Sequence, residues 1–131
     1  MQIKRNILCY DLREIASEKI RAVLTRPTIK ERDLLDLFLI SKIINLEKSL
    51  DRKKIINKIV SSKSFIKGLL EKIKGNIEML LNNTESIIEE KSKIMLIALD
   101  EEKYSSFKRE ITPFLISLGK QALIALKKTG F

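Results

Sequence analysis

Two apolar-patterned segments on either side of Pro27 constrain the first third of the chain to a helical hairpin. In the first segment Asp11 can cap a helix, with Glu14 placed to reach back as the second member of a capping box. This helix must stop before Pro27, because the residue that precedes a proline is pushed out of the helical region. Thr28 and Glu31 repeat the capping pattern before a second, leucine-rich segment. The sequence therefore predicts two helices joined by one turn.

Lys19 interrupts the apolar stripe of the first helix. At about 100° per residue, it falls in the middle of a stripe made by Leu12, Ile15, Ala16, Ala22 and Val23. Burying an unpaired ammonium costs several kcal/mol. Lys19 must therefore extend its charge into water, pair with a carboxylate, or face a ligand. Asp33 and Asp36, one turn apart in the next helix, are the nearest carboxylates that can face it.

The two helices resemble a pair of motifs from a known enzyme family. YDLREIASEKIRAVL over residues 10–24 and RDLLDL over residues 32–37 look like the third and fourth motifs of the AbiEii/AbiGii-type nucleotidyltransferases. These are the toxins of one class of bacterial and archaeal toxin–antitoxin systems. In that family a strand enters a helix of the form E-I-L-A-E-K-L-R-A-L, and an R-D-L-Y-D-L helix follows.

The resemblance implies roles for particular residues. By position Lys19, Asp33 and Asp36 correspond to catalytic residues, with Lys19 contacting nucleotide phosphates and an aspartate completing the site. Arg32 joins Lys19 as a nucleotide-binding residue, and Glu14 is a supporting motif residue. The implied reaction is nucleotidyl transfer from an NTP to a hydroxyl of RNA or protein.

The first two motifs of that family, a Gly-Ser turn and an Asp-x-Asp pair that holds metal, do not occur in this sequence. Nucleotidyl transfer depends on metal ions that neutralise charge on the phosphates. We therefore expect the C-terminal half of such an enzyme, which would use Mg²⁺ and NTP only when an N-terminal half completes it. We predict no cofactor or metal site from this chain alone. The expected partners are that N-terminal half, an antitoxin, RNA, or a second copy of the chain.

Composition limits the kinds of site that the chain can build. Its 131 residues suffice for one domain, and 44% hydrophobic with 33% charged residues is typical of a helical protein. With no histidine and Cys9 as the single cysteine, the sequence excludes an intrachain disulfide, a Cys/His zinc site and histidine catalysis. The sequence has no long apolar run and no signal-like start, so we expect a cytoplasmic protein without a membrane partner.

The whole chain is predicted to be a single, mainly α domain, with motif helices in residues 1–48 and a helical bundle in residues 49–131. A short strand over residues 3–9 should precede about six or seven helices packed in a compact bundle, an arrangement resembling the C-terminal part of a nucleotidyltransferase. The predicted boundary signals are Asp51 as a cap, a break at residues 61–64, a cap at Ser64, an end at Asn82-Asn83, starts at Thr84, Asp100 and Pro113, and an end at Lys127-Lys128. Gly68 and Gly75 are expected to permit close helix packing.

A run of basic residues suggests a second kind of activity. The net charge of +9 favours an anionic partner, and the cluster that we assign to RNA phosphates is Lys53, Lys54, Lys58, Lys63 and Lys67. No aromatic residues alternate with these lysines, so base stacking is not expected. A solvated helix face explains the cluster equally well. Two functions thus compete with nucleotidyl transfer: a non-catalytic helical interaction module with Lys19 in an ion pair, and a basic RNA-binding protein.

Overall fold

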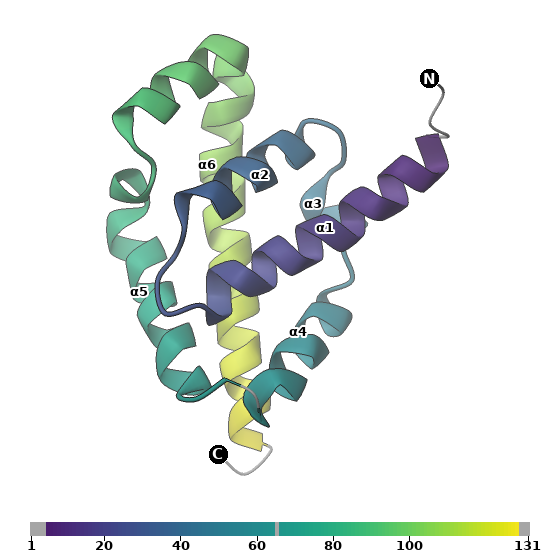
Figure 1. Cartoon of the computed structure of the whole chain (residues 1–131), viewed down its shortest axis with the longest axis vertical. Helices are drawn as coiled ribbons and strands as arrows, with labels where there is room; N and C mark the ends of the chain where they lie inside the picture. Colours follow the sequence, from purple (N-terminus) through teal and green to yellow (C-terminus); the bar gives the residue numbers. More distant parts are fainter. Residues whose placement is uncertain (1–4, 65, 129–131) are drawn as a thin grey trace.

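The computed structural model describes residues 5–64 and 66–128, with the side chains of residues 5–11 and 83–86 outside that description. Every regular element in these residues is helical, which confirms the predicted mainly α fold (Figure 1). No helix in the described part of the chain is long and apolar enough to cross a bilayer. The elements are α1 (Arg5–Thr25), α2 (Glu31–Ser41), α3 (Leu46–Ser49), α4 (Arg52–Ser61), the 3-10 turn η1 (Ser62–Ser64), α5 (Leu69–Ile87) and α6 (Glu90–Lys128).

The C-terminal helix α6 organises the bundle. α1 crosses in front of it, α5 and α4 pack against it on either side, and α2 folds back along α1 (Figure 1). The apolar faces of these helices meet in one core, whose largest fully buried side chains are Ile20, Leu24, Leu37, Phe38, Ile55, Ile59, Leu69, Ile73, Leu80, Leu96, Leu115 and Leu118. The α1–α2 hairpin is therefore held on a rigid support.

α6 bends at Asp100, which has extended backbone angles (φ −168°, ψ 91°). The backbone N–H of Lys103 donates to Asp100 Oδ1 over 3.0 Å, so the predicted cap is confirmed. The restart predicted at Pro113 is wrong, because α6 continues through this residue to Lys128. Pro113 is exposed, and α6 continues without the one backbone hydrogen bond that a proline cannot donate.

The N-terminal boundary also differs from the prediction. Residues 5–9 belong to α1 and not to a strand, while residues 3 and 4 lie outside the described residues. A lone strand leaves its backbone groups unpaired, whereas a longer helix pairs them within the segment. Asp11 consequently lies inside α1 and does not cap its start.

Two predicted signals around α4 are confirmed, and those of α5 are wrong. The N–H of Lys54 donates to Asp51 Oδ1 over 3.3 Å, and α4 ends where η1 begins. α5 starts after Gly68, whose φ of +67° suits a glycine, and not after Ser64. It also runs through residues 82–84 to Ile87, because burial of its apolar face outweighs the weak helix propensity of asparagine and threonine.

Gly119, and not Gly75, permits close approach between α5 and α6. A Cβ atom at Gly119 would lie 2.9 Å from the Ile77 side chain and 3.2 Å from that of Leu24. A Cβ atom at Gly75 would meet nothing within 4 Å. The packing role predicted for Gly75 is therefore wrong, and Gly68 serves the turn before α5.

Candidate active site

Lys19 of α1 lies between two carboxylates of α2. Its Nζ is 2.8 Å from Asp36 Oδ2 and 3.4 Å from Asp33 Oδ1. The side chain of Asp33 is 2% exposed, whereas those of Lys19 and Asp36 are 28% and 33% exposed. The hairpin thus brings together the three residues that the sequence singled out, with one buried carboxylate and one at the surface.

Arg26 is a second cationic partner of Asp33. Its Nη1 donates to Asp33 Oδ2 over 2.8 Å, so each oxygen of the buried carboxylate faces one cation. The backbone of Arg26 is fixed by Asn76 of α5, whose Nδ2 donates to the carbonyls of Leu24 (3.0 Å) and Arg26 (2.8 Å). Asn76 is itself 1% exposed. Asp33 is therefore an anchored group that holds Lys19 in place.

The carboxylates keep Lys19 charged. The hydrogen bond to Asp36 raises the pKa of the Lys19 ammonium above its ordinary value of 10.5, and the charges of Asp36 and Asp33 act in the same direction. Desolvation opposes this shift without reversing it. A lysine in this state donates hydrogen bonds and cannot act as a general base near neutral pH. It has three N–H donors, so it can bind an additional oxygen ligand.

Arg32 and Glu14 occupy different positions relative to this cluster. Arg32 is exposed and lies one helical turn before Asp36, with no hydrogen bond or ion pair to the described residues. Glu14 is also exposed, but its position is about 140° around α1 from Lys19. The structure therefore places Arg32 beside the cluster and Glu14 on another face.

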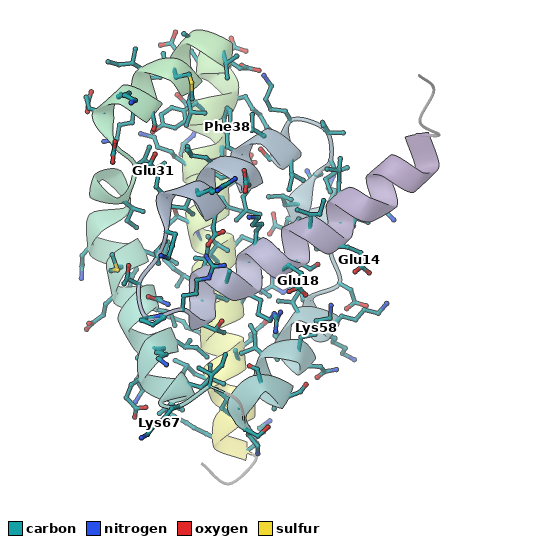
Figure 2. The ribbon with its side chains drawn as sticks, in the orientation of Figure 1. Glu14, Glu18, Glu31, Phe38, Lys58 and Lys67 are labelled. Carbon is teal, nitrogen blue, oxygen red and sulfur yellow. The ribbon has the colours of Figure 1, made fainter. Side chains whose placement is uncertain are left out.

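Glu31 joins the first turn of α2 to the start of α6 (Figure 2). Its Oε1 accepts from Ser92 Oγ over 2.6 Å, and its Oε2 accepts from the backbone N–H of Glu89 over 3.1 Å. The bond from Ser92, followed by that from Glu89, lowers the pKa of Glu31 from its ordinary value. The cap predicted for α2 is wrong: Lys30 occupies the cap position without a side-chain bond, and Glu31 caps a distant helix.

Sequence reasoning missed Arg26, Asn76 and this role of Glu31. Each contact joins segments that only the folded chain brings together, and Asn76 is 50 residues from Arg26. The short sequence distance between Arg26 and Asp33, seven residues, was the one signal in the sequence for their ion pair. It was not sufficient, because the path of the turn through Pro27 decides where the guanidinium points.

The donor set does not fit a metal ion. Both aspartates of the cluster already face cationic nitrogens. Among the side chains of residues 12–64, 66–82 and 87–128 there is no group of three or more cysteine, aspartate or glutamate residues arranged to hold a metal. Neither carboxylate of the cluster is therefore vacant for a metal ion in the described structure.

The predicted RNA-binding lysines are divided between elements. Lys54 and Lys58 line a cleft of about 220 Å³ between α1 and α4, together with Arg13. Lys58 Nζ also pairs with Glu18 Oε1 over 3.3 Å. The pKa of Glu18 is lowered, first by a hydrogen bond from Arg21 and to a smaller extent by Lys58. The remaining three, Lys53, Lys63 and Lys67, lie in α4, in η1 and before α5.

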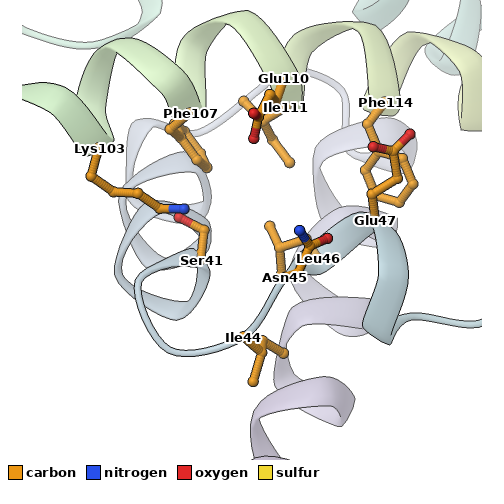
Figure 3. Close-up of a pocket in the computed structure, with 10 residues that line it drawn as sticks. All are labelled: Ser41, Ile44, Asn45, Leu46, Glu47, Lys103, Phe107, Glu110, Ile111 and Phe114. Carbon is orange, nitrogen blue, oxygen red and sulfur yellow. The ribbon is translucent and has the colours of Figure 1, made fainter.

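A second concavity of about 160 Å³ lies between the end of α2, α3 and the middle of α6 (Figure 3). Phe107, Ile111 and Phe114 form its apolar side. Its polar side consists of Ser41, Asn45, Glu47, Lys103 and Glu110. The three residues of the Lys19 cluster do not line it.

Comparison with known proteins extends the resemblance beyond the two motif helices. The model of the family described as "Nucleotidyl transferase AbiEii toxin, Type IV TA system" matches residues 2–125. No curated protein and no solved structure matches the chain. The matched range contains Lys19, both aspartates and most of the supporting bundle. The chain therefore belongs to the AbiEii nucleotidyltransferase toxin family of type IV toxin–antitoxin systems.

Proposed function

We propose that the Lys19 cluster binds the phosphates of an NTP during nucleotidyl transfer to a hydroxyl group, with an RNA 3′ end as the acceptor. The observation that carries this proposal is the arrangement of Lys19. Its ammonium is held charged between two carboxylates, and it retains access to solvent on the Asp36 side. A fixed cation at an accessible position is what phosphate binding requires.

The three side chains take different roles in this proposal. Lys19 donates one hydrogen bond to a phosphate oxygen and another to Asp36. Asp33, bound by Arg26, is a positioning residue that holds the Lys19 ammonium between α1 and α2. Asp36 is partly exposed and accepts a hydrogen bond from the acceptor hydroxyl. Arg32, one turn away, can form paired hydrogen bonds with a second phosphate group.

The metal-holding part of the enzyme lies outside this sequence in our proposal. The Gly-Ser and Asp-x-Asp motifs are not present in it, and the Lys19 cluster does not fit a cation. A polypeptide segment that carries those motifs must therefore approach the α1–α2 hairpin. Mg²⁺ bound by that segment would supply neutralisation of phosphate charge.

An apolar surface next to the cluster suits such a segment. Ile15 lies one turn before Lys19 on α1 and is 45% exposed. Leu39 and Ile43 follow Asp36 and are 48% and 61% exposed. Exposed apolar patches of this kind mark interaction sites in many proteins. We assign Ile15, Leu39 and Ile43 to the interface with the metal-holding segment.

Reconstituted activity tests this function. The chain is combined with a partner that carries the two missing motifs, and transfer of label from NTP to RNA is measured. Charge reversal by Asp36→Lys should abolish transfer, because it removes an acceptor and repels Lys19. The matched control is Lys120→Glu, a charge reversal at an exposed position of α6, which should leave transfer intact. Unchanged activity in Asp36→Lys would refute the assigned role.

A non-catalytic packing module is the second candidate, and the buried Asp33 favours it. A buried ion pair can often be replaced by apolar residues without loss of stability. If packing were the whole role, Lys19→Met combined with Asp33→Asn and Asp36→Asn would keep both the fold and any activity of the complex. Under the proposed function the triple variant stays folded and loses transfer.

A further inference from the structure

The first part of α6, residues 90–99, carries a concentrated group of exposed apolar side chains. Asp100 breaks the helix after this segment, so the segment leaves the axis of α6 and lies at one end of the bundle (Figure 1). Four of the nine large hydrophobic side chains that are exposed in the described residues belong to it: Ile94 (63%), Met95 (54%), Ile97 (42%) and Leu99 (57%). Single exposed apolar residues are common on protein surfaces, whereas a group of this kind marks an interaction site.

Both ends of the segment are tied to α2, which holds it in one position. At its start Ser92 Oγ donates to Glu31 Oε1 over 2.6 Å, and at its end Lys42 Nζ lies 3.8 Å from Asp100 Oδ2. A helix has 3.6 residues per turn, so Ile94 lies about 160° around the segment from the buried Ser92. The exposed group therefore points away from this contact with α2, and a polypeptide that approaches the Lys19 cluster does not have to cover it.

The charges that flank the exposed group are opposite in sign at its two ends. Lys91 lies three residues before Ile94, and Glu102 lies three residues after Leu99. Reversal of residues 90–103 about their midpoint superimposes no like charges and three pairs of opposite charges: Lys91 and Glu102, Glu90 and Lys103, and Lys93 and Asp100. The segment is therefore complementary in charge to a second copy of itself that runs in the opposite direction.

We infer that residues 90–103 form an interface between two copies of this chain, related by a twofold axis with the two segments antiparallel. Ile94 of one copy packs against Leu99 of the other, and Lys91 pairs with Glu102 at both ends of the contact. The inference does not depend on the proposed function, since the interface assigned to the metal-holding segment lies beside Lys19. One short segment per copy is less than the about 20 to 30 residues per side of a standard interface. The dimer should therefore be weak and should exchange with the monomer.

Sedimentation of the full chain over a concentration series up to millimolar tests the inference. The unaltered chain should pass from monomer to dimer, and Ile94→Asp should weaken the dimer about a hundredfold, because each copy loses a buried apolar contact. The matched control is Ile124→Asp, which places the same charge at a 56% exposed isoleucine of α6 and should change the affinity little. Circular dichroism checks that both variants fold. A chain that stays monomeric throughout, or a dimer that Ile94→Asp leaves intact, would overturn the inference.

Charge exchange tests the antiparallel pairing itself. Lys91→Glu and Glu102→Lys should each weaken the dimer about tenfold, because two attractive pairs become repulsive. The double variant Lys91→Glu/Glu102→Lys should restore it, and an equal mixture of the two single variants should form heterodimers. Lys91 also lies near Glu31, so Glu102→Lys is the cleaner single variant. Failure of both rescues would overturn the pairing. A monomeric chain whose Ile94→Asp variant instead loses a different partner would assign the surface to that partner.

Discussion

Arg26 Nη1 donates to Asp33 Oδ2 over 2.8 Å, and this bond separates the roles of the two aspartates of α2. Asp33 is buried and holds two cations, whereas Asp36 holds Lys19 alone and meets solvent. The buried carboxylate therefore supports the structure, and the exposed one is free to exchange partners with a ligand.

This difference predicts unequal losses of stability. Asp33→Asn leaves Arg26 and Lys19 without a buried anionic partner and should lower the free energy of unfolding by about 2 kcal/mol. Asp36→Asn breaks a partly exposed pair and should cost less than about 1 kcal/mol. Urea unfolding followed by circular dichroism measures both. Equal losses would contradict the assignment of Asp33 as the anchor.

The raised pKa of Lys19 predicts low chemical reactivity. At any pH below its pKa, a smaller fraction of Lys19 is the neutral amine that reacts with an acylating reagent than at an exposed lysine. Asp36→Asn removes the largest cause of the shift, so acylation of Lys19 should become faster. Mass spectrometry of peptides after brief acetylation gives the rates, with Lys120 as the internal reference. A fast-reacting Lys19 in the unaltered protein would refute the pairing.

Glu31 predicts a pH-dependent contribution to stability. Its pKa is lower in the folded protein than its ordinary value of 4.5, so its contribution is fully present above that pH. The contribution is lost as the pH falls through the folded value. Glu31→Gln should therefore lower the free energy of unfolding at pH 7. The difference in this free energy between the variant and the unaltered protein should narrow as the pH falls. Unfolding at pH 7 and pH 3.5 tests this, and a difference that does not depend on pH would exclude an ionised Glu31 as the cause.

The two glycines in helices α5 and α6 make a matched pair of substitutions. Gly119→Ala places a methyl group against Ile77 and Leu24 and should cost about 1 to 2 kcal/mol. Gly75→Ala meets nothing within 4 Å and should stabilise α5 by up to about 1 kcal/mol. Thermal unfolding of the two variants should give shifts of opposite sign. Shifts of the same sign would contradict the packing described for α5 and α6.

Contacts within short stretches of the sequence could be predicted, whereas contacts between residues far apart in the chain could not. The Lys19 mismatch and the spacing of Asp33 and Asp36 identified the cluster, because a helical hairpin fixes which faces meet. Asp51 and Asp100 were predicted as caps, since each acts within its own turn. These successes depend on short stretches of chain.

The remaining contacts depend on tertiary structure. Asn76 and Glu31 satisfy backbone groups of other helices, so no local pattern indicates their partners. α5 passes through Asn82 because the burial of Ile77 and Leu80 decides its length. The strand predicted before the first helix was wrong for a related reason. A strand without a neighbouring strand cannot pair its backbone groups, whereas a helix can.

The most direct test of the central claim is nucleotidyl transfer by the native complex that contains this chain. The complex is purified, the sequence of any partner is inspected for Gly-Ser and Asp-x-Asp motifs, and transfer is compared for Lys19→Gln and Lys120→Gln. We predict a partner that carries both motifs. Transfer should fall about 10²-fold in Lys19→Gln and should not fall in Lys120→Gln. Full activity in Lys19→Gln, in a complex that transfers nucleotide, would contradict the role of Lys19 in phosphate binding.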